Sequence, residues 1–111
     1  MQLRLLVGMV GLGLVVTTAL SAFAASQHVA EAIKHARVAV AQGQQNYPDE
    51  LVKHAEEALD HADMAKKETS SPHLGEGIAQ LREAMTEAEE GYLDEAVGAV
   101  EEAIRHFSEI Q

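Results

Sequence analysis

Apolar residues recur every three or four positions through most of the chain after residue 27, with charged residues between them. This spacing places the apolar side chains on one face of an α-helix. It predicts four helices. The first three cover about residues 27–42, 48–67 and 72–90, and the fourth starts near residue 92. Pro48 and Pro72 suit first helical turns, Ser71 suits an N-cap, and Gly43–Asn46 and Gly91 suit the breaks.

Short loops within each pair of helices indicate antiparallel neighbours. The predicted fold is therefore all-α: an antiparallel, up-down-up-down four-helix bundle made of two αα-hairpins. Hairpin 1 covers about residues 27–68 and hairpin 2 about residues 72–110, within a domain of residues 25–111.

The two hairpins resemble each other in sequence at a fixed offset. Moving residues 28–61 forward by 45 positions places His28 on His73, Tyr47 on Tyr92 and His61 on His106 without a gap. Self-similarity of this kind indicates a duplicated structural unit. A two-helix hairpin cannot bury its own apolar stripe, which gives a physical reason for the duplication.

Residues 1–24 have the features of a secretory signal peptide. One positive charge at Arg4 precedes an apolar run over residues 5–16, and Ala22-Phe23-Ala24 supplies small residues at a cleavage site. An uncleaved membrane anchor is the alternative, but Thr17, Thr18 and Ser21 interrupt the run before about 20 residues. We therefore expect an exported protein with no stable membrane association after cleavage.

The net charge is −10, and losing Arg4 with the leader makes it −11. This acidity argues against nucleic acid or an anionic membrane as a partner, because both need a basic surface. The chain has no Cys, so thiolate metal sites and disulfides are excluded. The acidic charge favours the retention of cations near the surface, and the sequence identifies no protein partner.

Histidine is the residue type that suggests chemistry. The pattern His-x-x-Glu-x-x-x-His occurs at residues 28–35 and again at residues 54–61, and it keeps all three side chains on one helix face. These faces lie on the shoulder of each helix, beside the apolar stripe. The six candidate metal ligands are His28, His35, His54, His61, His73 and His106.

Antiparallel packing also predicts the height of each histidine. Residues at one height in such a hairpin have a constant sum of residue numbers, and His28/His61 and His35/His54 share the sum 89. Hairpin 2 is expected to retain one such pair, His73/His106. Whether the paired shoulders face each other depends on the handedness of the bundle, which the sequence leaves open.

Imidazole and carboxylate ligands suit Cu(II), Ni(II) and Zn(II), and Cu(II) binds tightest in the general affinity order. The alternative is a structural or interaction module, such as a periplasmic adaptor or chaperone-like bundle, with solvated histidines. No nucleophile–base set suggests an enzyme. Di-iron bundles need Glu-x-x-His on two helices, and this spacing is absent.

The stretch His54-Ala-Glu-Glu-Ala-Leu-Asp-His61-Ala, with Ile33-Lys34-His35-Ala36 before it and residues 71–78 after it, resembles the small metal-binding protein family. The resemblance covers about residues 28–107. It implies a His-rich periplasmic four-helix bundle that binds several divalent metals, copper foremost, for buffering or detoxification. Gln80, Tyr92 and Ala99 stand where a richer member would place further imidazoles.

Overall fold

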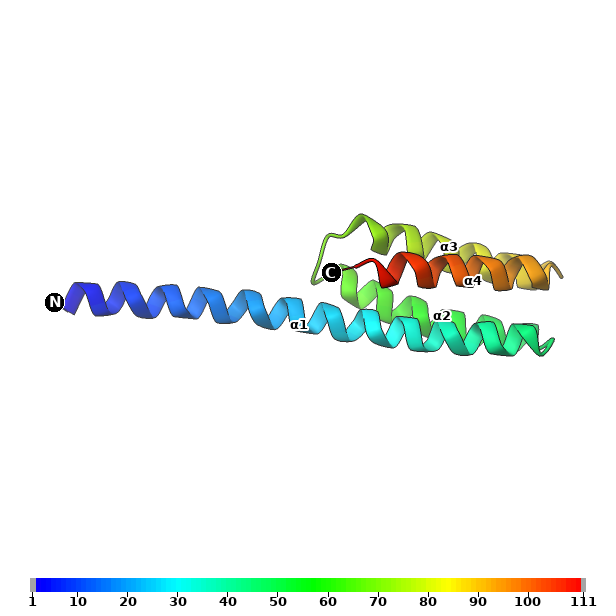
Figure 1. Ribbon diagram of the computed structural model, residues 1–111, viewed down its shortest axis with the longest axis horizontal. Coiled ribbons are helices and arrows are strands. Elements are labelled where there is room, and N and C mark those ends of the chain that lie inside the picture. Colours follow the sequence, from blue (N-terminus) through cyan, green and yellow to red (C-terminus); the bar gives the residue numbers. More distant parts are fainter. Residues whose placement is uncertain (1, 111) are drawn as a thin grey trace.

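Four helices account for most of the chain: α1 (Gln2–Gln44), α2 (Pro48–Lys66), α3 (Pro72–Glu89) and α4 (Leu93–Ser108). The computed structural model describes the backbone of residues 2–110 and the side chains of residues 22–110. Each helix packs against two neighbours, in the order α1, α2, α3, α4 and back to α1 (Figure 1). The predicted all-α, four-helix bundle is confirmed.

The two hairpin turns share one backbone conformation. Asn46 adopts a φ of 70°, and the N–H of Tyr47 donates to the Gln42 carbonyl over 3.0 Å. Gly91, 45 positions after Asn46, adopts a φ of 91°, and the Tyr92 N–H donates to the carbonyl five residues earlier over 2.8 Å. A left-handed residue followed by this bond satisfies the last carbonyls of a helix. The turns therefore hold both hairpins in the same register.

The predicted helix boundaries are close to those observed for α2, α3 and α4, whereas α1 begins much earlier than the predicted residue 27. No proline and no strong helix stop separates the leader from the bundle, so the backbone continues as helix through the expected cleavage point after Ala24. Most of the expected leader (residue 1 and the side chains of residues 1–21) lies outside the described residues. Within residues 22–110, no helix is long and apolar enough to cross a membrane.

Ser71 occupies the N-cap position of α3, as predicted, but its side chain makes no capping hydrogen bond. Its φ and ψ of −64° and 131° are those of extended chain. The helix start is therefore set by the backbone and by Pro72 at the first helical position, whose fixed φ is compatible with a helix.

The core consists largely of alanine, with a few large side chains. The largest fully buried ones are Phe107, Leu51, Leu74, Leu81 and Val100. Alanine lets helices approach closely, and between residues 22 and 110 no polar or charged side chain is buried. The histidines and carboxylates therefore lie outside the core, as the shoulder positions predicted.

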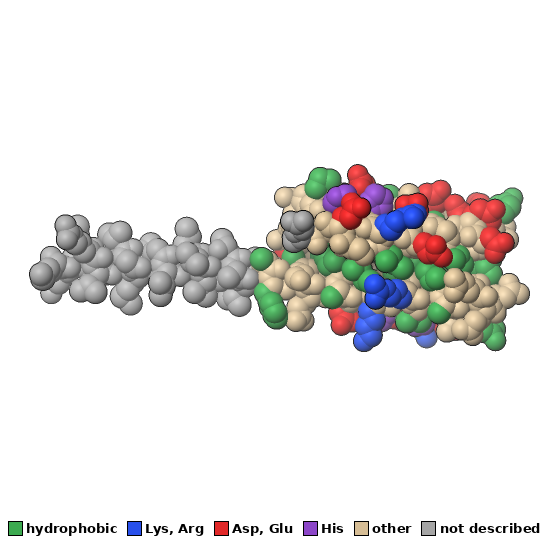
Figure 2. Space-filling model, in the orientation of Figure 1, with side chains coloured by type: hydrophobic (Ala, Val, Ile, Leu, Met, Phe, Trp, Pro, Cys, Tyr) green, Lys and Arg blue, Asp and Glu red, His purple; other side chains and the backbone are tan. Residues whose placement is uncertain are grey.

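The order of packing determines where the histidine-bearing surfaces lie. Because α2 packs on α3 and α1 packs on α4, the outer α1–α2 groove and the outer α3–α4 groove are on opposite sides of the bundle. Figure 2 shows histidine and acidic side chains together along the α3–α4 edge. Each hairpin therefore presents its own surface for a ligand.

Candidate metal centre

The paired histidines face each other across each hairpin groove. The ring centroids are 5.9 Å apart for His28 and His61, and 6.3 Å apart for His35 and His54. In hairpin 2, the rings of His73 and His106 are 5.8 Å apart. The three pairs predicted from residue numbering are confirmed, and the question of facing, which the sequence left open, is answered.

A contact between the two pairs in hairpin 1 was not predicted. The rings of His35 and His61 are nearly parallel, with an interplanar angle of 10° and centroids 5.4 Å apart. Side chains on a helix lean toward its N-terminus. In antiparallel helices this lean carries His35 and His61 toward each other, so helix direction, and not only spacing, would have predicted the contact. Four imidazoles thus form one continuous row.

Carboxylates complete two three-residue groups in hairpin 1. One group contains His35, His54 and Glu57, and the other contains Glu31, His35 and His61. In each group, one potential ligand atom from every residue lies within 4.8 Å of the others. His35 belongs to both groups.

Glu57 lies between the two histidines of its group. Its Oε2 atom is 2.7 Å from His35 Nδ1 and 3.5 Å from His54 Nδ1. Glu50 approaches the other nitrogen of His54 at 3.9 Å. His35 and His54 are 24% and 21% exposed, so the group can be reached from solvent yet is partly shielded from it.

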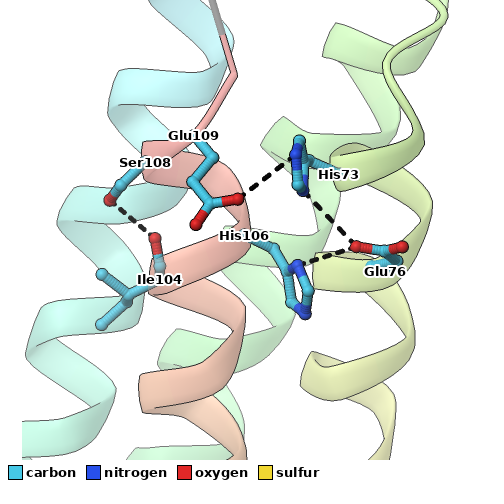
Figure 3. Close-up of polar contacts among 6 residues, drawn as sticks. All are labelled: His73, Glu76, Ile104, His106, Ser108 and Glu109. Carbon is cyan, nitrogen blue, oxygen red and sulfur yellow. Dashed lines mark hydrogen bonds and ion pairs between the residues drawn. The ribbon is translucent and has the colours of Figure 1, made fainter.

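Hairpin 2 has one group, built in a similar way (Figure 3). Glu76 Oε2 lies 2.8 Å from His106 Nδ1 and 3.4 Å from His73 Nδ1. Glu109, at the end of α4, places Oε2 3.3 Å from His73 Nε2. A carboxylate thus sits between two imidazoles here as well, although it comes from the first helix of the hairpin and Glu57 comes from the second.

Several imidazole nitrogens have no hydrogen-bond partner. The Nδ1 atoms of His54, His61 and His73 are inaccessible to water and make no hydrogen bond, although those of His54 and His73 lie 3.5 and 3.4 Å from carboxylate oxygens. A shielded nitrogen left without a partner is unfavourable in a protein unless another ligand binds to it. Neutral imidazole nitrogens beside carboxylate oxygens are the ligands that divalent transition metals prefer. The donor set therefore fits a metal ion.

Five of the six predicted histidines join these groups, and His28 does not. It lies beside His61 at the end of the row, outside the three groups formed by the described residues. The second pair missing from hairpin 2 is replaced by Gln80 and Ala99, as the sequence indicated.

Residue spacing does not identify which carboxylates act as ligands. Glu31 and Glu57 were placed on the histidine face, and the structure brings both into groups. Glu50 and Glu109 were missed because they lie outside the His-x-x-Glu-x-x-x-His pattern. Glu50 nevertheless stands four residues before His54, and residues at this spacing are neighbours on a helix. Glu109 stands three residues after His106, so it lies on the same side of the chain's last turn as His106, and the predicted pairing of His106 with His73 was the signal for its contact with His73.

The protein combines a four-helix bundle with surface His/Glu groups whose ligand atoms could hold a metal ion. No match was found among curated individual proteins. A family described as small metal-binding protein matches residues 3–110, which is nearly the whole chain. The His/Glu groups in both hairpin grooves give that description a structural basis. The chain belongs to the small metal-binding protein family.

Proposed function

We propose that the protein binds and buffers divalent transition metals in the periplasm, with Cu(II) foremost and Ni(II) or Zn(II) as weaker competitors. The observation that carries the proposal is the recurrence of a carboxylate between two imidazoles in both hairpins. Cu(II) comes first because it lies at the top of the general affinity order for nitrogen and oxygen ligands. The proposal assigns the protein no catalytic step.

Export by cleavage after Ala24 is part of the proposal. It is supported by the apolar leader and by the small residues at the cleavage site. The bundle residues begin after that point, so removal of the leader leaves all three His/Glu groups intact. Comparing the mass of the protein recovered from the periplasm with that of the full chain tests this part separately.

Calorimetric titration with Cu(II) near pH 7.5 tests metal binding. We expect micromolar or tighter affinity, about −8 kcal/mol or better. A variant with all six histidines changed to Gln should lose this binding and remain helical by circular dichroism. Binding should also weaken as the pH falls below about 6, because protonated imidazole cannot bind a metal.

A matched variant separates coordination from general attraction to an acidic surface. It keeps every histidine and neutralises six exposed carboxylates distant from the groups: Glu83, Glu89, Glu90, Asp94, Glu95 and Glu101. This variant should bind the same number of ions with slightly lower affinity. Equal loss of binding in both variants, or none in either, would contradict the proposal. The second result would favour an interaction module whose histidines are solvated.

A further inference from the structure

His35 is the one histidine that belongs to two ligand groups among the described residues. Its ring lies between two others and is nearly parallel to both, at 6.3 Å from His54 and 5.4 Å from His61. The neighbouring groups in hairpin 1 are therefore not independent, because both depend on one side chain. Nothing comparable occurs in hairpin 2, where the position corresponding to His35 is Gln80.

The two nitrogens of His35 lie on different edges of the ring, so one ring can serve both groups. Nδ1 faces Glu57, at 2.7 Å from its Oε2 atom. When Nδ1 binds an ion beside Glu57, Nε2 is the nitrogen left for the group of Glu31 and His61. His61 Nδ1 is inaccessible to water and has no hydrogen-bond partner, so this second group contains an imidazole nitrogen that is free to bind a metal ion.

We propose that hairpin 1 holds two divalent ions at the same time, with the His35 imidazole bound to both. One ion takes His35 Nδ1 with His54 and Glu57, and the other takes His35 Nε2 with His61 and Glu31. A neutral imidazole carries one N–H, so binding at both nitrogens releases that proton to solvent. No other bond breaks and no electron is transferred. The inference rests on the proposed function.

The charges at hairpin 1 match such a pair of ions. Glu31 and Glu57 belong to the two groups, and Glu50 lies 3.9 Å from His54 Nε2. These three carboxylates and a deprotonated His35 carry four negative charges, which equals the charge of two dications. Close like charges repel strongly in partly shielded sites, so this balance is what allows two ions to lie near each other.

Electron paramagnetic resonance of the Cu(II)-loaded protein tests the proposal. The hairpin 2 group is first removed by His73→Gln and His106→Gln, so that any bound copper reports on hairpin 1. At two equivalents we expect two bound ions, with a signal that integrates to less than the bound copper, because two Cu(II) ions joined by one imidazolate are spin-coupled. At one equivalent the signal should integrate to the full copper content.

Two further variants in this background identify the shared ligand. His35→Gln should weaken both binding steps by at least about tenfold and abolish the spin coupling. His54→Gln should weaken one step alone. The His28→Gln variant is the matched control, because it removes an imidazole from the same helix face but from none of the groups, and it should leave the coupling in place.

Each alternative outcome overturns the inference. Two ions with a full, uncoupled signal would mean independent sites, and a single ion in hairpin 1 would mean that the groups exclude each other. If His35→Gln weakened only one of the two copper-binding steps, His35 would not be a ligand of both ions. In all these cases copper still binds, so the proposed function survives. Absence of binding in the unmodified protein would instead refute both.

Discussion

Hairpin 1 and hairpin 2 share a turn conformation but have different ligand surfaces. Hairpin 1 has two histidine pairs, while hairpin 2 has Gln80 and Ala99 in place of the second pair. The carboxylates differ too: Glu57 contacts His35, whereas Glu102, 45 positions later, pairs with Arg105. The residue corresponding to Arg105 in hairpin 1 is Asp60. Within the described residues, Glu102 pairs with a cation on its own helix where Glu57 pairs with a histidine.

Two differences between the cores of the hairpins compensate for each other in size. Gly77 and Phe107 occupy the positions that Ala32 and Ala62 occupy in hairpin 1. A Cβ atom on Gly77 would lie 2.3 Å from Phe107 Cε1, so the large ring requires the missing side chain. The comparison shows that packing partners differ together, while the two turns have the same conformation.

The largest expected effect is on this packing pair. Phe107→Ala removes a fully buried ring and should lower the free energy of unfolding by about 3–5 kcal/mol. Gly77→Ala should lower it by about 1–3 kcal/mol, since the new Cβ overlaps the ring. The double variant recreates the Ala32/Ala62 combination and should lose less than the sum of the single changes. Urea unfolding of all four proteins measures this coupling.

The control for this cycle is Gly98→Ala. Gly98 lies within α4, and a Cβ atom there would have no neighbour within 4 Å. Alanine should raise the free energy of unfolding by about 0.5–1 kcal/mol through backbone entropy alone. Strictly additive effects of Gly77→Ala and Phe107→Ala would mean that the overlap is relieved elsewhere.

Grafting the missing pair onto hairpin 2 tests the ligand comparison. The variant Gln80→His/Ala99→His/Arg105→Asp places the hairpin 1 residues at the corresponding positions and releases Glu102 from Arg105. We expect it to bind more copper at saturation than the unmodified protein, by one ion. Metal analysis after dialysis measures the capacity, and circular dichroism checks the fold.

The matched control keeps Arg105 and carries only Gln80→His and Ala99→His. It should gain less bound copper at saturation than the triple variant, because Glu102 stays paired with Arg105 on the same helix. If both variants fold and neither binds more copper than the unmodified protein, the difference between the hairpins does not depend on these positions.

The smallest expected effect concerns Glu87, whose counterpart in hairpin 1 is Gln42. Partial burial raises the pKa of Glu87 above its usual value, and a hydrogen bond and the like charge of Glu83 raise this pKa further, as do the charges of Glu95 and Glu90. A raised pKa in the folded state means that ionisation of Glu87 opposes folding. This penalty is fully present above the folded-state pKa and disappears as the pH falls to the unfolded value.

Glu87→Gln should therefore raise the Tm slightly at pH 7, and the gain should shrink as the pH falls below that folded-state pKa. Thermal unfolding of both proteins across this pH range measures the difference. Glu89→Gln is the control, because it removes the same charge from an exposed position of α3. A gain that is equal for both variants would mean that net charge, and not the surroundings of Glu87, is responsible.

Most of the fold followed from local signals. Pro48 and Pro72 lie at the first positions of α2 and α3, and the positive φ of Gly91 marks the turn before α4. The start of α1 was wrong because propensity gives no reason for a helix to end inside an apolar, alanine-rich stretch. The ion pair of Glu102 with Arg105 could also have been predicted, since residues three apart are neighbours on a helix.

Residue spacing alone established the helices, their antiparallel pairing and the heights at which histidines meet, because these depend only on helix geometry. Packing in three dimensions established the rest. It turned the histidine shoulders of each hairpin toward each other, brought His35 against His61, and placed Glu109 beside His73. The lean of each side chain toward the N-terminus of its own helix is a local property. Whether two leaning side chains meet depends on the handedness of the bundle, which is set only when four helices pack around a common core.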